Sequence, residues 1–214
     1  MYKKFLKRLI DFVIALCGLP FFAIIFVIVA PLIYFEDKGT IFYKAPRVGK
    51  DKKVFQVYKF RSMKVNAPDI RNKDGSTYNG EDDPRVTKIG KILRKTSIDE
   101  TAQILNVLKG DMSIIGPRPA TTKIFENLDE LKEARFTVYP GITGYTQMKY
   151  RNSAQGKLRY EADKYYVENL SFLLDLKIVF GTVIKVLNRS GLYNDGGAQQ
   201  TETQKEEVNK WFSK

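Results

Sequence analysis

An uncharged and strongly apolar stretch near the N-terminus, from Phe12 to Phe35, constrains this chain more than any other feature. As a continuous helix it would reach about 36 Å, enough to cross the hydrocarbon core of a bilayer, about 30 Å thick. A soluble core helix is a poor explanation because the stretch is apolar on all sides. A cleaved signal peptide is also a poor one, since no small-residue cleavage site follows it. The sequence therefore predicts a membrane-associated helix.

Two residues inside the stretch, Gly18 and Pro20, weaken a straight helix, because glycine adds backbone freedom and proline removes a hydrogen bond. Lysines and arginines flank the stretch on both sides, and such residues mark the cytoplasmic side of a membrane segment. They are Lys3, Lys4, Lys7 and Arg8 before it, and Lys38, Lys44, Arg47, Lys50, Lys52 and Lys53 after it. We therefore expect a re-entrant helix that breaks at Gly18 and Pro20 and returns to the same face. A straight span is the alternative.

The composition excludes several kinds of active site. The chain has no histidine and a single cysteine, Cys17, so a His/Cys zinc site, a Ser-His-Asp triad and an internal disulfide are all impossible. Catalysis would have to rest on carboxylates, lysine, arginine, hydroxyl groups, backbone amides or a hard metal ion. The net charge of +12 favours a polyanionic partner, such as an anionic lipid surface, a phosphorylated substrate or nucleic acid.

The remainder of the chain predicts a small, helix-rich α/β domain with few strands and several amphipathic helices at the membrane interface. We expect a membrane-associated helix over residues 1–36, a cytoplasmic domain over 37–191 and a flexible tail over 192–214. Strands are predicted at Thr40–Pro46 and Lys53–Phe60, helices at Thr87–Lys95, Asp129–Phe136 and Gly156–Gly191, and loops at 66–85 and 138–147. The apolar positions of Leu173–Leu187 fit either a helix packed on the core or one lying in the membrane interface.

An acidic pair, Asp99 and Glu100, follows Ser97 in an otherwise basic region. Ser97 and Glu100 have the spacing of a capping box, in which serine caps a helix and glutamate reaches back to the serine amide. Such a cap, on a helix that ends at Gly110, would explain both carboxylates without catalysis. The alternative is a reaction centre, because a carboxylate at a helix N-terminus stays ionised and is a nucleophile without a base.

A proline-framed arginine, Arg118, follows the pair. Pro117 and Pro119 fix its backbone, and a planar guanidinium held in a defined place suits two-point contacts with a phosphate. Other cations precede the pair, and each is by itself typical of a solvated surface: Arg85, Lys88, Lys91, Arg94 and Lys95.

Several long motifs, in one order, resemble those of the bacterial sugar transferase family. They are FLKRLID at Phe5–Asp11, YKFRSM at Tyr58–Met63, DPRVTKIGKILRKTSIDE at Asp83–Glu100, NVLKGDMSIIGPRP at Asn106–Pro119 and PGITG at Pro140–Gly144. The likeness extends from about Phe5 to Gly191 and is closest to the short, single-domain monotopic phosphoglycosyl transferases. Enzymes of this kind lie on the cytoplasmic face of the bacterial inner membrane, among membrane lipids. They move a phosphosugar from a UDP-sugar to undecaprenyl phosphate and release UMP.

The resemblance also implies residue roles. Asp99 matches the carboxylate that becomes covalently linked to the phosphosugar, and Glu100 matches its neighbour, a metal ligand or an orienting group. Magnesium is implied as the cofactor, with Asp99 and Glu100 as its ligands. Arg118 and, less directly, Arg94 match phosphate-binding residues, and Arg151 falls where the family places a nucleotide contact.

Three positions depart from the family pattern: Tyr139 replaces a frequent arginine before PGITG, Thr101–Gln103 replaces the usual Leu-Pro-Gln, and GYTQMKYRN at Gly144–Asn152 differs from the usual GLAQVNGRN. The first and third leave the nucleotide and sugar contacts open.

A membrane-tethered binding or scaffold protein without catalysis is the alternative function, although it does not account for the acidic pair beside a framed arginine. No RNA-recognition or helix-turn-helix signature is present in the sequence, so nucleic acid is not an expected partner.

Overall fold

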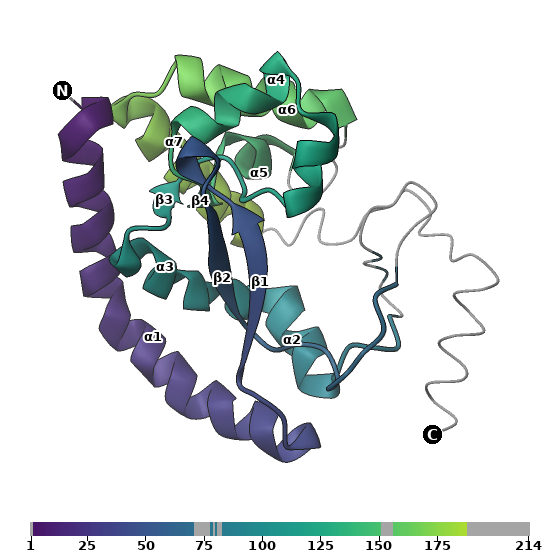
Figure 1. Cartoon of the computed structure of the whole chain (residues 1–214). Coiled ribbons are helices and arrows are strands. Elements are labelled where there is room, and N and C mark those ends of the chain that lie inside the picture. Colours follow the sequence, from purple (N-terminus) through teal and green to yellow (C-terminus); the bar gives the residue numbers. More distant parts are fainter. Residues whose placement is uncertain (1, 71–77, 79, 81–82, 151–155, 188–214) are drawn as a thin grey trace.

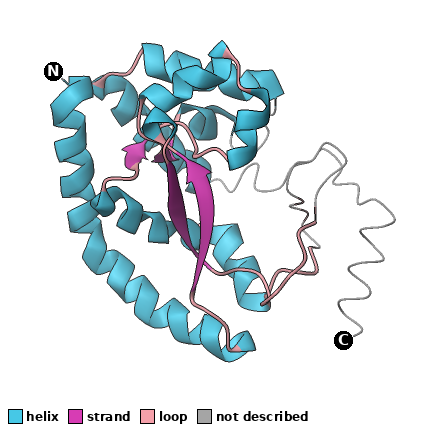
Figure 2. Cartoon of the chain, in the orientation of Figure 1, coloured by secondary structure: helices cyan, strands magenta, loops and turns pink. Residues whose placement is uncertain are grey.

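A computed structural model gives the structure of residues 2–70, 78, 80, 83–150 and 156–187. Helices dominate and the strands are few (Figure 2), which confirms the predicted helix-rich α/β class. The helices are α1 (Lys7–Asp37), α2 (Lys88–Thr96), α3 (Ile104–Lys109), α4 (Glu130–Glu133), α5 (Tyr145–Tyr150), α6 (Gly156–Glu168) and α7 (Phe172–Leu187). The strands are β1 (Phe42–Val48), β2 (Val54–Phe60), β3 (Ser113–Ile115) and β4 (Gly141–Thr143). The tail predicted at 192–214 lies outside the described residues.

The apolar stretch forms α1, a single helix that curves along one side of the molecule (Figure 1). The helix is not interrupted at Gly18 and Pro20, because it is continuous through both residues and through Pro31; the re-entrant bend predicted there stays a prediction. A helix accommodates an internal proline by bending rather than by ending. Gly18 has a packing role instead, since a Cβ atom there would lie 2.7 Å from Cδ1 of Ile104 in α3.

One face of α1 packs on the rest of the protein and the other is exposed. Phe22, Val29 and Ile33 are buried in a cluster with Phe60 and Leu93. Large apolar side chains cover the remaining circumference and are exposed: Leu9, Phe12, Val13, Ile14, Leu16, Phe21, Ile24, Val27, Ile28, Leu32 and Phe35. Among the described residues, α1 is the helix that is long and apolar enough to cross a membrane.

The N-terminal end of α1 is attached to the domain by buried ions. The Lys7 ammonium lies 2.9 Å from the carboxylate of Asp175 in α7, and Tyr2 donates a hydrogen bond to the same carboxylate. Asp11 accepts hydrogen bonds from the Ser113 hydroxyl, at 2.7 Å, and from the backbone N–H of Ile114. Because these groups are taken out of water, each depends on its partner, and the contacts fix the start of α1 against β3 and α7.

The C-terminal end of α1 is attached to the opposite part of the domain. Both carboxylate oxygens of Asp37 accept from the Arg61 guanidinium at 2.6 Å. The Glu36 carboxylate accepts from the backbone N–H groups of Lys88 and Ile89. These are among the N–H groups that the first turn of a helix leaves unpaired, so α1 supplies a cap to α2.

The two predicted strands are confirmed as an antiparallel hairpin, β1–β2, with Phe42 paired to Phe60 and Val48 to Val54. The predicted helix after residue 87 is confirmed as α2, where the Thr87 hydroxyl accepts from the Gly90 N–H. A second sheet was not predicted. β3 and β4 pair in parallel, so the stretch 138–147, predicted as a loop, contains β4 and the start of α5.

The C-terminal helical stretch divides into α6 and α7. Ile178 of α7 is fully buried beside Tyr166 of α6, which fits the prediction of a core helix. The opposite face of α7 exposes Leu173, Phe180, Val183 and Ile184. α7 therefore has one face in the core and an apolar face outside it, as does α1.

Candidate active site

The segment that carries the acidic pair does not begin with a capping box. Ser97 ends α2 in the left-handed conformation, with φ of 59°, and its side chain caps no helix. A 3-10 helix, Ile98–Gln103, follows and leads into α3, which ends at Gly110. The Glu100 N–H donates to the Ser97 carbonyl, while the Glu100 carboxylate points elsewhere. The capping explanation of the acidic pair is therefore wrong.

Glu100 pairs with two cations that are distant in sequence. Its Oε1 atom accepts from Nη2 of Arg118 and from Nζ of Lys59, each at 2.5 Å, and its Oε2 atom lies 3.2 Å from Nη1 of Arg118. Lys59 is near the end of β2 and Arg118 follows β3. Glu100 thus fixes two cations from different elements beside Asp99.

Asp99 is buried and is much less engaged. The Lys59 ammonium lies 3.9 Å from its Oδ2 atom, and the described residues donate no hydrogen bond to its carboxylate. Arg94 approaches from α2, where its Nε atom donates to the Ser62 hydroxyl at 2.9 Å. Asp99 therefore keeps lone pairs for a reaction partner while cations surround it.

The environments of the two carboxylates separate their pKa values. Burial raises the pKa of Asp99 above its usual range, and the charge of Glu100 adds to this, while Lys59, Arg94 and Arg118 oppose it. Burial would raise the pKa of Glu100 as well, but Arg118 and Lys59 outweigh it and hold that pKa far below its usual range. Burial of Asp99 depends on tertiary packing, so its effect on the pKa does not follow from the predicted helix terminus.

Arg118 is held by a backbone crossing between two loops. The Gly141 N–H donates to the Pro117 carbonyl at 3.0 Å, and the Gly116 N–H donates to the Thr143 carbonyl. A Cβ atom at Gly116 would lie 2.3 Å from the Tyr139 carbonyl oxygen, so the loops need glycine there. The Arg135 guanidinium also donates to the Arg118 carbonyl. The parallel β3–β4 pairing thus sets the position from which Arg118 reaches Glu100.

Four of the five predicted polar site residues lie together: Asp99, Glu100, Arg94 and Arg118. Arg151 lies outside the described residues. Sequence reasoning missed Lys59, although it stands inside YKFRSM, one of the motifs that carried the family resemblance.

In the described part of the chain, few oxygen atoms near the acidic pair are available to hold the predicted magnesium ion. The described residues contain no group of three or more acidic or cysteine side chains that could hold a metal ion. Both Glu100 oxygens are occupied by cations, whereas Asp99 retains acceptor capacity. Magnesium is commonly held by one or two carboxylates together with substrate phosphates and water, and Asp99 fits that pattern.

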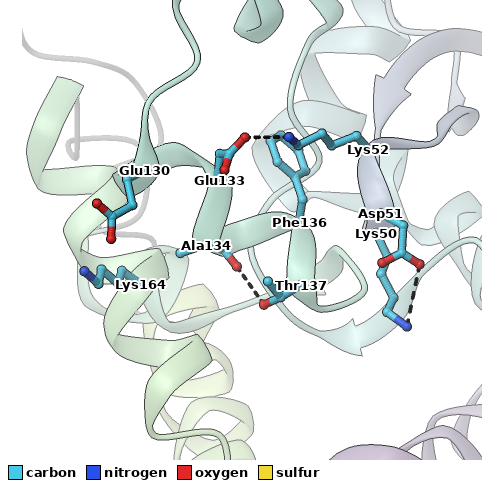
Figure 3. A pocket seen from close by; sticks show the side chains of 9 residues that line it. All are labelled: Lys50, Asp51, Lys52, Glu130, Glu133, Ala134, Phe136, Thr137 and Lys164. Atoms are coloured by element: carbon cyan, nitrogen blue, oxygen red, sulfur yellow. Dashed lines mark hydrogen bonds and ion pairs between the residues drawn. The ribbon is translucent and has the colours of Figure 1, made fainter.

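A separate open groove of about 740 Å³ lies between the β1–β2 turn, the α4 region and α6 (Figure 3). Within its lining Lys52 pairs with Glu133 and Lys50 with Asp51, and Lys164 pairs with Glu168 outside it. None of the predicted site residues is among the residues that line it. The acidic pair and its cations are therefore the candidate active site.

Comparisons with known proteins show the family to which the chain belongs. The family model described as "Bacterial sugar transferase" matches residues 2–189. The chain is 38% identical over 195 residues to a UDP-N-acetylgalactosamine-undecaprenyl-phosphate N-acetylgalactosaminephosphotransferase of Aeromonas hydrophila, covering 87% of this chain and 45% of that protein. It is 35% identical over 207 residues to an undecaprenyl-phosphate galactose phosphotransferase of Salmonella typhimurium, covering 89% and 42%.

A third relative has nearly the same length. The chain is 38% identical over 195 residues to the exopolysaccharide production protein PSS of Rhizobium leguminosarum bv. phaseoli, covering 86% of this chain and 96% of that protein. The chain spans less than half the length of the two named phosphotransferases. With the family model matching nearly the whole described chain, the protein belongs to the bacterial sugar transferase family.

Proposed function

We propose that the protein transfers a phosphosugar from a UDP-sugar to undecaprenyl phosphate, with release of UMP, through a covalent intermediate on Asp99. One observation carries the proposal: a buried carboxylate with free acceptor capacity lies among Lys59, Arg94 and Arg118. Cations around a carboxylate nucleophile reduce its repulsion from a diphosphate. The names of the relatives, which act on undecaprenyl phosphate, support the same acceptor.

In the first step, a carboxylate oxygen of Asp99 attacks the phosphorus atom that bears the sugar. The bond from this phosphorus to the bridging oxygen of the UDP-sugar breaks, and UMP leaves with that oxygen and the electron pair. In the second step, an oxygen of undecaprenyl phosphate attacks the same phosphorus, and Asp99 leaves as a carboxylate. Each step exchanges one P–O bond for another, so no external base is needed.

The neighbouring residues have separate roles. Arg118 binds the phosphate under attack through its guanidinium, and Lys59 and Arg94 keep Asp99 ionised and attract the donor. Glu100 is a positioning residue, because it holds Arg118 and Lys59 at 2.5 Å and its own lone pairs are used for that. This role differs from the metal ligation that the family resemblance implied for Glu100.

We also propose magnesium as the cofactor, held by Asp99 together with phosphate oxygens of the donor. When bound, the ion would supply charge neutralisation that allows an anionic nucleophile to approach a diphosphate. Asp99 supports this because it is the member of the pair with free acceptor capacity.

The membrane topology belongs to the same proposal: α1 lies in one leaflet, with both ends on the cytoplasmic face of the inner membrane. Its length is about 46 Å, more than a bilayer core requires. Yet Lys7 near one end and Asp37 at the other both pair with the same domain. A helix that crossed the membrane would place these ends on opposite sides. The exposed apolar faces of α1 and α7 supply surface for lipid contact.

The test is to mix purified protein, magnesium and a panel of UDP-sugars without lipid acceptor, and to measure the intact mass. We expect a phosphosugar adduct on the wild type with the cognate sugar, and none on Asp99→Asn, with the fold retained by circular dichroism. Addition of undecaprenyl phosphate should discharge the adduct. Product formation by Asp99→Asn at the wild-type rate would rule out the covalent route, and absence of UMP release from every donor would leave a binding or scaffold protein.

A further inference from the structure

A cation that neither the motifs nor the proposed mechanism uses, Arg159, lies in a cluster of guanidinium groups beside the active site. Arg135 joins this cluster to the Arg118 loop, since its Nη2 atom donates to the Arg118 carbonyl and lies 3.1 Å from Oδ2 of Asp163. Arg159 and Asp163 are four residues apart on α6, so they share one face of that helix. α6 therefore presents Arg159 toward the loop that carries Arg118.

The neighbouring guanidinium groups of this cluster have carboxylate partners. Arg118 pairs with Glu100, and Arg135 pairs with Asp163. Among the described residues, Arg159 makes no hydrogen bond and no ion pair, although it is only partly exposed. Burial and the charges of Arg135 and Arg118 disfavour the Arg159 cation, and Asp163 attracts it. A cation withdrawn from water beside other cations costs free energy, and such strain is usual where a charged ligand completes the site.

The balance of charges in this region also favours an anionic ligand. Lys59, Arg94, Arg118, Arg135 and Arg159 carry five positive charges, and Asp99, Glu100 and Asp163 carry three negative ones. Counting these groups alone, the region carries a net charge of +2. Burial, together with Arg135 and Arg118, lowers the pKa of Arg159 to about 10, so it still carries its charge at neutral pH.

We propose that Arg159 is a further substrate-binding residue, which contacts a phosphate group of a substrate together with Arg118. The inference rests on the proposed function and adds a residue to it. Arg118 lies within electrostatic reach of both Asp99 and Arg159. A diphosphate attacked by Asp99 can therefore extend past Arg118 toward Arg159. Two sources carry the required phosphate, the nucleotide of the donor and the head group of the acceptor lipid.

The test compares Arg159→Gln and Arg159→Lys with a matched control, Lys157→Gln. Lys157 is on the same helix, its side chain is 81% exposed, and the change removes the same charge. Binding of UDP, UMP and a short-chain prenyl phosphate to the purified full-length protein is measured by calorimetry. We expect Arg159→Gln to weaken one of these ligand classes by about tenfold to a hundredfold, as loss of a charge-assisted contact does. Arg159→Lys should weaken it less, and Lys157→Gln by no more than about twofold.

The ligand-free protein gives a second readout that separates binding from structure. Because burial and two neighbouring cations disfavour the Arg159 charge, we expect Arg159→Gln to melt at the same temperature as the wild type or higher. If Arg159→Gln weakens the binding of UDP and UMP but not that of prenyl phosphate, Arg159 contacts the phosphate of the donor. If it weakens only the binding of prenyl phosphate, Arg159 contacts the phosphate of the acceptor lipid. Unchanged binding of all three, or a protein that melts lower or fails to fold, overturns the proposal. The Asp99→Asn adduct experiment is independent, so failure of Arg159 leaves the covalent route standing.

Discussion

At the scale of single residues, the chemistry of the site depends on the opposite surroundings of two adjacent carboxylates. Glu100 is saturated by Arg118 and Lys59, whereas Asp99 is buried with its lone pairs largely free. Pairs of carboxylates whose pKa values are driven apart commonly divide their roles in this way. Here the ionised, saturated residue positions cations and the freer residue is the nucleophile that we propose.

The raised pKa of Asp99 predicts an acid limb in the rate of adduct formation. The reactive form is deprotonated, so the rate falls as the pH drops through a pKa that lies above the usual aspartate value of about 3.9. Lys59 is the strongest of the cations that lower this pKa. Lys59→Met should therefore move the acid limb to higher pH, as measured by single-turnover adduct formation across a pH series.

The control for this prediction is Lys53→Met, which removes an exposed lysine immediately before β2. Its acid limb should coincide with that of the wild type, because exposed charges are screened by solvent. If the limb stays in place in Lys59→Met as well, protonation of Asp99 does not control the rate.

At the scale of secondary structure elements, the junction at Ser97 decides how the acidic pair is presented. Ser97 ends α2 with a positive φ of 59°, and the chain then turns into the 3-10 helix that carries Asp99 and Glu100. Glycine adopts this conformation without the penalty that a Cβ atom imposes. The site therefore begins at a helix C-terminus, although the sequence pattern is that of a helix start.

The substitution Ser97→Gly distinguishes a left-handed residue at position 97 from a helix N-cap by the sign of the change in stability. In the left-handed conformation, we expect Ser97→Gly to stabilise the fold by about 0.5–1 kcal/mol, since the strain of a non-glycine residue is removed. If Ser97 were a helix N-cap, Ser97→Gly would cost a few tenths of a kcal/mol and Ser97→Ala about 1 kcal/mol. Thermal unfolding of the detergent-solubilised variants measures this difference, and a lower melting temperature for Ser97→Gly would contradict the conformation described here.

At the scale of the whole molecule, the attachment of both ends of α1 to one domain leads to a topological prediction. In a Cys17→Ser background, a single cysteine is introduced at Lys3 or at Thr40, which lie before and after α1 and are exposed. We expect a membrane-impermeant maleimide to label both positions in inside-out vesicles and neither in intact spheroplasts. A cysteine introduced into an established periplasmic loop of another membrane protein serves as the control. Labelling of either position from the periplasmic side would mean that α1 crosses the bilayer.

Features that depend on neighbouring residues and on composition follow from the sequence alone. They include the apolar helix, predicted from its length, the β1–β2 hairpin, predicted from its pattern, and the classes of catalysis that the lack of histidine excludes. These succeed because hydrophobic periodicity and residue chemistry act over a few positions.

Which groups meet in the site depends on how the chain packs in three dimensions. Lys59 lies 41 residues from Glu100, and Arg118 lies 18 residues beyond it on a loop fixed by the parallel β3–β4 pair. Burial of Asp99 and the guanidinium cluster around Arg159 likewise depend on segments far apart in the chain. The free energy of these groups is set by solvent exclusion and by long-range neighbours, which local patterns do not contain.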